Sequence, residues 1–355
     1  MSIAVEFDNV SIVFGDNAKS ALPHMDAGHD RAEVRAQSGQ ILGVHNCSLK
    51  VASGEILVLM GLSGSGKSTL LRAVNGLNPV VRGAVNVNVG DAMVDVTRAN
   101  AATVRDIRQH RVAMVFQQFG LLPWRSVREN VGLGLELAGE PVAMRNTKID
   151  QQLALVGLSD WADHKVGDLS GGMQQRVGLA RAFVTDAPTL LMDEPFSALD
   201  PLIRTRLQDE LIALQKDLKR TIIFVSHDLD EAFKIGDRIA IMDGGRIVQC
   251  GTPQEIFTNP ASAYVAEFVA HMNPLGVLCA RDVMAPSVGT AEISVPPDAS
   301  IKQVIKAISG VAPAKDADPT AGVVGVLEDG QQIGQITRAA ILAKLLDPRN
   351  PVPSP

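Results

Sequence analysis

Short apolar runs rich in β-branched residues alternate with longer amphipathic stretches from the start of the chain to about residue 270. This alternation is typical of an α/β domain with a largely parallel sheet. The expected strands are Ile56–Met60, Val112–Phe116, Thr189–Met192, Thr221–Val225 and a closing pair, Ile239–Met242 and Arg246–Gln249. The expected helices are Lys67–Asn75, Lys148–Val156, Gly171–Val184, Pro201–Leu218 and Ala261–Val269.

Two segments depart from this pattern. A long polar connection between Gly15 and Gly43 exceeds the usual link between neighbouring strands, and we expect a short helix in it. Beyond Asn273-Pro274 the chain reads as a small α+β unit with a loop rich in Ala, Pro and Asp over 311–320. We therefore predict a large domain over 1–273, a linker over 274–279, a small domain over 280–347 and a flexible tail over 348–355.

The composition narrows the class of protein. With 46% hydrophobic and 20% charged residues the chain can bury a sizeable core, which excludes wholesale disorder. A net charge of −6 argues against a nucleic-acid protein that works through an overall basic surface. The 3 cysteines are far apart and form no CxxC pair, which suits a reducing cytosol. We expect no signal peptide, because the first residues contain no basic segment followed by an apolar stretch, and no apolar run approaches the ~20 residues of a membrane span. We expect a soluble cytosolic chain whose membrane role comes through a partner.

The chemistry starts with a glycine-rich segment between an expected strand and an expected helix. The run Gly61-Leu62-Ser63-Gly64-Ser65-Gly66-Lys67-Ser68-Thr69 fits GxxxxGK[ST]. Its glycines let backbone N–H groups turn inward around phosphate oxygens, and the helix start adds partial positive charge. Lys67 would reach the β- and γ-phosphates, Ser68 would ligate Mg²⁺, and Thr69 would cap the helix or bind the α-phosphate. An ordinary Gly/Ser turn is the alternative, and the flanking strand and helix weigh against it.

Two adjacent carboxylates, Asp193 and Glu194, end a buried strand. Beside a phosphate loop, an acidic residue at such a strand end is where Mg²⁺ is held. We expect Asp193 to bind the metal and Glu194 to orient and deprotonate the attacking water. A solvated acidic turn is the alternative, and the pairing with a phosphate loop weighs against it.

Other polar residues follow strands of the same expected sheet. Gln117 follows one strand and His227 another, and the carboxyl ends of parallel strands form the ligand edge of an open sheet. A lone Gln or His is usually structural, so this shared position is what favours a functional role. Phe14, near the end of the first strand, either stacks on a base or belongs to the core.

A second anion site is expected at Leu169–Met173, where Ser170 precedes the free N–H groups of a strong helix. An ordinary helix cap is the alternative. Because one chain does not need two γ-phosphate sites, this one would serve a nucleotide held by another subunit.

Together these motifs resemble the ATP-binding subunit of ABC transporters. The phosphate loop, Gln117, LSGGM, Leu190–Glu194, the SALD segment Ser197–Asp200 and His227 occur in the family's order between Val5 and Val269. The resemblance implies an α/β P-loop ABC cassette with a mixed sheet core and a helical signature subdomain at about 118–185. It implies a head-to-tail homodimer with two ATP molecules and Mg²⁺. Each site would use Glu194, His227 and Gln117 in catalysis, Ser68, Gln117 and Asp193 at the metal, and, in trans, Ser170, Gly171, Gly172, Gln174 and Asp200.

A narrower resemblance is to importers of quaternary amines. It is carried by the insertion ALPHMDAGHDRAEV, by Leu59–Gly83 and Met114–Asn130, and by a C-terminal unit that looks like a CBS domain. It implies uptake of choline first, or of glycine betaine or proline betaine, with a permease and a periplasmic or lipid-anchored binding protein as partners. The chain would lie on the cytoplasmic side of the cell membrane and bind no nucleic acid. The alternatives are the ATPase of another amino-acid or osmolyte importer, a regulatory ATP sensor, and a soluble ABC ATPase of DNA repair or translation.

Two further segments carry expectations. The apolar residues in Gln117–Arg125 form either a groove for a cytosolic helix of the permease or part of the helical subdomain's packing. The unit Ala280–Leu346 resembles a single CBS motif. At the position where nucleotide-binding members of that family place an aspartate, three residues after Thr337, this chain has Ala340. We therefore expect a dimerising domain without a tight adenine-nucleotide site, and sensing of ionic strength is a further role that this domain could have.

Overall fold

A computed structural model describes residues 2–270, 272–287, 289–291, 293–309 and 323–346. The chain divides into two compact units, one made of residues up to 227 with 235–248, the other of 228–234 with residues from 249 onward. The loop expected over 311–320 and the tail expected over 348–355 lie outside the described residues.

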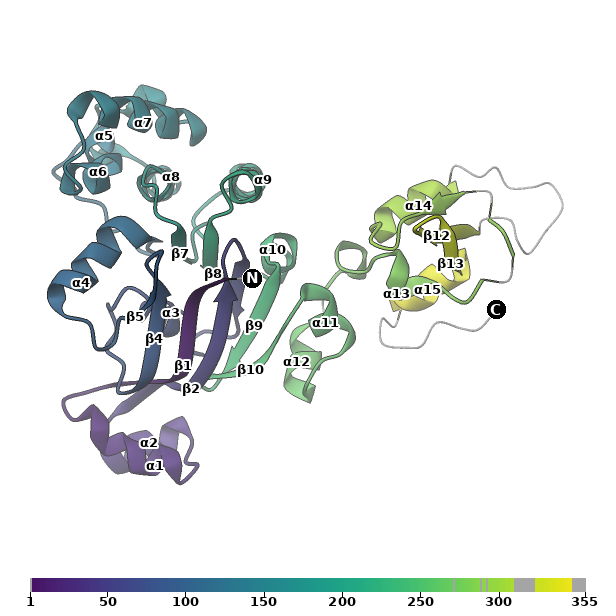
Figure 1. Cartoon of the computed structure of the whole chain (residues 1–355), viewed down its shortest axis with the longest axis horizontal. Coiled ribbons are helices and arrows are strands. Elements are labelled where there is room, and N and C mark those ends of the chain that lie inside the picture. Colours follow the sequence, from purple (N-terminus) through teal and green to yellow (C-terminus); the bar gives the residue numbers. More distant parts are fainter. Residues whose placement is uncertain (1, 271, 288, 292, 310–322, 347–355) are drawn as a thin grey trace. The chain divides into compact units, whose positions relative to one another are not determined.

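The first unit holds a sheet in the order β10-β9-β3-β8-β7-β6, of which Figure 1 labels β7, β8, β9 and β10. Every residue of β3, β7 and β8 is buried, as expected for apolar strands covered on both faces. The pairs β3–β8, β3–β9, β6–β7 and β7–β8 are parallel, so these strands end at one edge. The bounds are β3 Ile56–Met60, β6 Val112–Val115, β7 Thr189–Asp193, β8 Thr221–Val225, β9 Arg238–Asp243 and β10 Arg246–Gly251.

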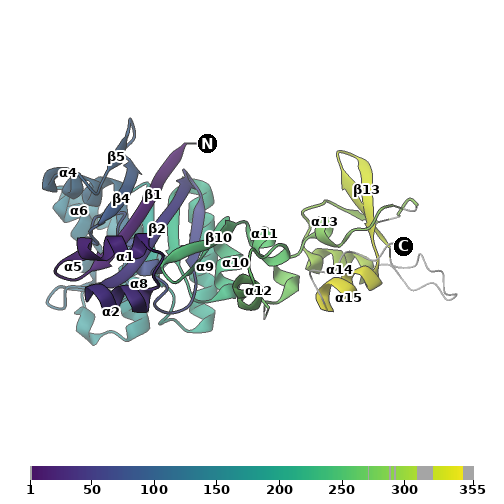
Figure 2. The ribbon, with the colours of Figure 1, turned by 90° about the horizontal axis from the view of Figure 1, so that it is seen from below.

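A second, antiparallel sheet has the order β2-β1-β4-β5, which can be followed in Figure 2. Its strands are β1 Ile3–Phe14, β2 Ile41–Ala52, β4 Arg82–Asn88 and β5 Met93–Asp95. Phe14 at the end of β1 pairs with Ile41 at the start of β2. The insertion is therefore the long connection of a hairpin between these two strands.

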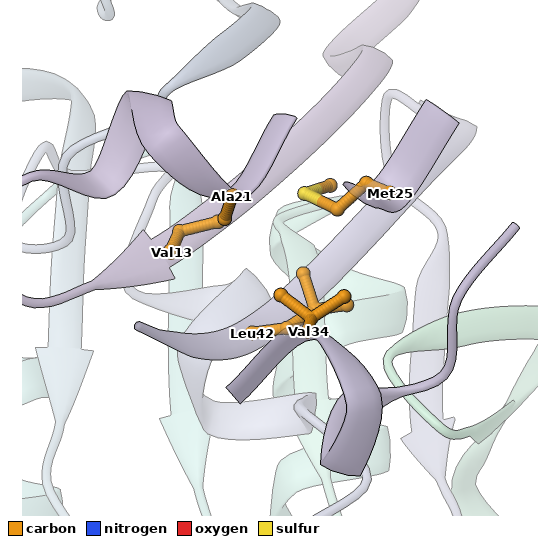
Figure 3. Close-up of a cluster of buried hydrophobic side chains, with 5 residues drawn as sticks. All are labelled: Val13, Ala21, Met25, Val34 and Leu42. Atoms are coloured by element: carbon orange, nitrogen blue, oxygen red, sulfur yellow. The ribbon is translucent and has the colours of Figure 1, made fainter. Parts of the chain in front are cut away.

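The insertion contains more structure than the one short helix expected. A 3-10 turn over Ala18–Ala21 leads into α1 (Leu22–Asp26) and then α2 (Arg31–Ser38), beside one end of β1 and β2 (Figure 1). Figure 3 shows the small core that holds these elements together, in which buried side chains of the insertion meet side chains of both strands. The cluster comprises Val13, Ala21, Met25, Val34 and Leu42.

The helices differ from the sequence expectation mainly in length. α9 (Pro201–Leu218) matches it, whereas α3 (Lys67–Leu71) is shorter because turns follow it, and α7 (Val142–Leu155) begins earlier. The expected helical subdomain also contains α5 (Val127–Val131), α6 (Leu133–Leu137) and α8 (Gly171–Phe183). The first unit also contains α4 (Ala101–Asp106), followed by a π-helical turn, whereas α10 (Leu229–Ile235) groups with the second unit except for its last residue.

The second unit carries a small sheet in the order β11-β12-β13, with β11–β12 parallel and β12–β13 antiparallel. Packing groups α11 (Pro253–Thr258) and α12 (Ala263–Phe268) with this unit, whereas the sequence assigned them to the large domain. The other elements are α13 Ala280–Val283, β11 Ser294–Val295, α14 Ile301–Ser309, β12 Val324–Glu328, β13 Gln331–Ile336 and α15 Arg338–Leu346. Across the described ranges, no helix has the length and apolar character of a membrane span.

Candidate nucleotide site

The phosphate loop leaves β3 through glycines that no other residue could replace. Gly61 has a φ of 139°, and a Cβ there would lie 2.1 Å from the carbonyl oxygen of Met242. Gly66 has a φ of 104°, and its Cβ would lie 2.6 Å from the carbonyl oxygen of Gly43. Both positions lack space and require a left-handed backbone, so glycine is needed on two grounds.

Lys67, the first residue of α3, is buried, and its ammonium is bound to the loop itself. Its Nζ donates to the carbonyl oxygens of Gly61 and Leu62, both at 2.9 Å. Burial lowers the pKa of Lys67, and the nearby carboxylates of Glu194 and Asp193 oppose that shift. The Lys67 ammonium is therefore held inside the phosphate loop, where the motif predicts that phosphate oxygens bind.

Asp193 is fully buried at the end of β7, and both of its oxygens are bonded. Ser68 donates its hydroxyl to Oδ1 at 2.6 Å, and Arg72 donates to Oδ2 through Nη2 at 2.8 Å and Nε at 3.2 Å. A buried charge needs such partners, since desolvation is costly. The two residues expected at the metal are thus in contact, and a hydroxyl and a carboxylate are oxygen ligands of the kind Mg²⁺ prefers.

Glu194 turns away from its neighbour through an unusual backbone conformation. Its φ is 49°, and its N–H donates to the carbonyl oxygen of Val225 at 3.1 Å. Its Oε2 lies 3.2 Å from Nε2 of Gln117 and 3.2 Å from Nδ1 of His227. The carboxylates of Asp193 and Glu194 therefore have separate partners. Gln117 is hydrogen-bonded to Glu194.

These groups border a cavity of about 780 Å³. Ten residues expected at the site line it: Phe14, Ser63, Gly64, Gly66, Lys67, Ser68, Thr69, Gln117, Glu194 and His227. Four other residues that we expected at the site do not line the cavity. Gly61, Leu62 and Ser65 belong to the phosphate loop, and Asp193 is fully buried. Six lining residues were not expected from the sequence: Arg31, Ala32, Arg35, Ile41, Leu42 and Gly43.

Phe14 is 37% exposed and lines the cavity. Its ring lies over Gly43, where an added Cβ would be 2.9 Å from Cε2 of Phe14. Of the two interpretations left open by the sequence, this position favours stacking on a base over packing in the core.

The residues expected to act in trans lie in the caps of two helices. Ser170 accepts from the N–H of Met173 at 3.4 Å at the start of α8, and Asp200 accepts from that of Ile203 at 3.0 Å at the start of α9. Within the described part of the chain, none of Ser170, Gly171, Gly172, Gln174 and Asp200 lines the cavity.

The segment after Gln117 is bound to the same helix α8. Arg181 donates to the carbonyl oxygens of Phe119 at 2.8 Å and Gly120 at 2.7 Å. Burial lowers the pKa of this guanidinium. The chain that follows Gln117 therefore depends on α8 for its position.

A parallel sheet whose edge carries a phosphate loop, a buried Asp on the loop serine and a Glu–His pair defines a P-loop ATPase of the cassette type. Comparison with known proteins agrees. The family model described as ABC transporter matches residues 44–197. The glycine betaine/proline betaine transport system ATP-binding protein ProV of Escherichia coli (strain K12) is 46% identical over 283 residues, 80% of this chain and 70% of that protein.

Two further comparisons extend this match. The trimethylamine N-oxide transport system ATP-binding protein TmoW of Ruegeria pomeroyi is 39% identical over 338 residues, 95% of this chain and 96% of that protein. A dimeric ATP-binding cassette solved in a post-hydrolysis state with ADP and Pi has a TM-score of 0.61 and 28% identity, over 70% of this chain and 98% of that one. The chain belongs to the ABC transporter family as an ATP-binding subunit, which confirms the fold and activity expected from its motifs.

Proposed function

We propose that the chain hydrolyses ATP to power an ABC importer of a small compound whose nitrogen has four substituents and no hydrogen. The observation that carries the hydrolytic part is the division of the two carboxylates. Asp193 is bonded to Ser68 and Arg72, whereas Glu194 faces the cavity with Gln117 and His227.

This arrangement supports a general-base role for Glu194. A water between Glu194 and the γ-phosphate would give its proton to the carboxylate as its oxygen attacks phosphorus, and ADP would leave as phosphate forms. The hydrogen bond from Gln117 and the contact with His227 fix the carboxylate's orientation. Lys67 would exchange its two loop carbonyls for phosphate oxygens. Mg²⁺, when bound, would neutralise phosphate charge, and Ser68 and Asp193 would hold it. Gln117, the third residue expected at the metal, is hydrogen-bonded to Glu194.

The complete site would need two copies of the chain. Ser170, Gly171, Gly172, Gln174 and Asp200 are absent from the cavity lining in the described residues, and Ser170 caps α8, whose first N–H groups can receive an anion. We infer that they complete the site of a second copy, in a head-to-tail homodimer. The dimeric state of the similar cassette supports this inference.

The substrate class rests on the relatives. ProV is named for glycine betaine and proline betaine and TmoW for trimethylamine N-oxide, compounds that share a nitrogen carrying only carbon or oxygen substituents. We infer the same class here, with glycine betaine as the first compound to test, while choline stays a prediction. A permease, a periplasmic or lipid-anchored binding protein and a position at the cytoplasmic face of the cell membrane follow from such a function.

Transport by the reconstituted complex tests this proposal. Proteoliposomes that contain this chain with its permease and substrate-binding protein would be loaded with ATP, and uptake of labelled glycine betaine, choline and trimethylamine N-oxide would be measured. We expect ATP-dependent uptake of at least one of these, abolished by Glu194→Gln. ATP hydrolysis by the chain with uptake only of amino acids or polyamines would overturn the substrate class and leave the ATPase assignment standing.

A further inference from the structure

The insertion of residues 16–40 reaches into the nucleotide site through one arginine. Arg31, the first residue of α2, donates from Nη1 to the carbonyl oxygen of Gly64 at 2.5 Å and from Nη2 to that of Gly43. Gly64 lies in the phosphate loop and Gly43 lies in β2. One guanidinium therefore joins the insertion, the antiparallel sheet and the phosphate loop.

The surroundings of Arg31 are shaped to admit this side chain. A Cβ on Gly245 would lie 2.7 Å from Nη2 of Arg31, and one on Gly66 would lie 3.4 Å from the same atom. With Gly43, whose carbonyl accepts from Nη2, these residues form what we call the glycine cradle (Gly43, Gly66 and Gly245). At Gly245 and Gly66 the guanidinium lies where a side chain would begin, and at Gly43 it is bound through the backbone carbonyl.

The helix that carries Arg31 is fixed on both sides. Asp30 and Glu33 form a capping box at its start, with Asp30 Oδ1 accepting from the Glu33 N–H and Glu33 Oε2 from the Asp30 N–H, both at 2.8 Å. Val34 is fully buried in the insertion core (Figure 3). Arg35, four residues after Arg31, lies on the same helix face and also lines the cavity.

Arg31 and Arg35 differ in their environment. Burial lowers the pKa of Arg31, against which the charge of Asp243 acts. Arg35 is exposed, and among the described residues no acidic side chain pairs with it. One cation is therefore committed to the protein backbone, and the other is available to a ligand.

We propose that the insertion is a wall of the nucleotide site, in which Arg31 is a positioning residue that holds the phosphate loop and Arg35 binds the nucleotide directly. The proposal rests on the proposed ATPase function. In this proposal α2 contributes to nucleotide affinity in addition to the phosphate loop, the carboxylates and Phe14. Pinning the carbonyl of Gly64 restricts the loop before ATP arrives, so less conformational entropy is lost on binding.

The test measures ATP affinity of the full chain in EDTA, where turnover stops, by calorimetry, together with the melting temperature with and without ATP. We expect Arg31→Ala to raise the Kd for ATP about tenfold and to reduce the ATP-dependent rise in melting temperature accordingly. Arg31→Lys should rescue little, because an ammonium cannot reproduce the planar fork between two carbonyls. Arg35→Ala should raise Kd about threefold at low salt, with the effect fading at high salt, since its charge is exposed.

Arg82→Ala is the matched control. Arg82 anchors the insertion from outside the cavity by donating to Oδ1 of Asp26 at 2.6 Å. This variant should lower the melting temperature without ATP and leave Kd unchanged. A Kd within about twofold of wild type in both folded Arg31 variants would overturn the proposal. An equal rise of the Kd for ATP in Arg82→Ala would also overturn it, because it would show that ATP affinity depends only on the stability of the insertion. Failure of the wild-type chain to bind ATP would instead refute the proposed function.

Discussion

Nδ1 of His227 lies 3.2 Å from Oε2 of Glu194. Glu194 directly follows β7 and His227 comes two residues after β8, so this contact connects the ends of two parallel strands. Gln117, after β6, approaches the same oxygen. A carboxylate shared by two polar neighbours is oriented without being bound to the metal side of the site. Its removal should therefore affect the chemical step and spare nucleotide binding.

We expect Glu194→Gln to keep ATP affinity near the wild-type value and to lower kcat by at least about 100-fold, because an amide cannot accept the water's proton. ATP-bound dimers should then accumulate, which size-exclusion chromatography with multi-angle light scattering would detect. Lys67→Ala is the contrasting variant, and it should weaken binding itself, since its ammonium is the cation of the loop. Near wild-type hydrolysis by Glu194→Gln would contradict the assignment.

Coupling to the permease should depend on Trp124, which is 69% exposed, more than on its neighbour Leu122. Leu122 is half-buried, and its backbone is bonded in both directions to the side chain of the buried Asn130. We expect Trp124→Glu to leave the ATPase of the isolated chain unchanged and to reduce transport and permease-stimulated hydrolysis. A charged residue at Leu122 should act in the same direction with a smaller loss of transport, because that side chain is half-buried.

The matched control is Trp161→Glu, a second surface tryptophan of the helical subdomain, which should leave transport intact. Parallel loss of basal ATPase and of thermal stability in the Trp124 and Leu122 variants would show instead that the apolar stretch packs the subdomain.

Cys47 should make the stability of the fold fall at alkaline pH. Its thiol is buried and donates to the carbonyl oxygen of Gly245 at 3.3 Å, and burial raises the pKa to about 11 from an ordinary 9.0. Between these values the folded state keeps a proton that the unfolded chain has released, so rising pH favours unfolding. Urea unfolding at pH 8 and 10.5 should show a loss about 2 kcal/mol larger in the wild type than in Cys47→Ala. Equal losses would refute this account.

The C-terminal unit should bind no adenine nucleotide tightly. Ala340 is buried at the start of α15, and its N–H donates to the Thr337 hydroxyl at 3.1 Å, so the position provides no carboxylate for ribose hydroxyls. A missing charge-assisted bond costs a ligand roughly 1.5–3 kcal/mol. Calorimetry of AMP and of a cyclic dinucleotide with the Lys67→Ala chain, whose cassette binds weakly, should show no binding at micromolar concentrations.

Deletion from Ala280 onward provides the companion measurement. It should leave basal ATPase intact and change its regulation by ionic strength. Micromolar binding of either nucleotide to the full chain, lost on this deletion, would contradict the prediction.

The sequence predicted best those elements that depend on local pattern. β3, β8 and α9 have the predicted bounds because continuous apolar runs or a proline start and amphipathic period define them. The loop, the carboxylates and His227 converge as expected because parallel strands end at one edge. Arg31 could not be found this way, since its partner Gly64 is 33 residues away and the contact depends on a hairpin formed by β1 and β2. Asp30-x-x-Glu33 and the two arginines four residues apart were the available signals.

The glycine cradle also has a genetic consequence. Every single-nucleotide change in a glycine codon that alters the residue introduces a Cβ, or ends the chain. At position 43 that atom would meet Phe14, at 66 the backbone of residue 43, and at 245 the guanidinium of Arg31. Three codons in distant parts of the gene are therefore constrained by the close packing around Phe14, Gly43 and Arg31. In a library of random single-nucleotide variants selected for transport they should be depleted together, whereas Gly139, with open space around its Cβ position, should tolerate aspartate.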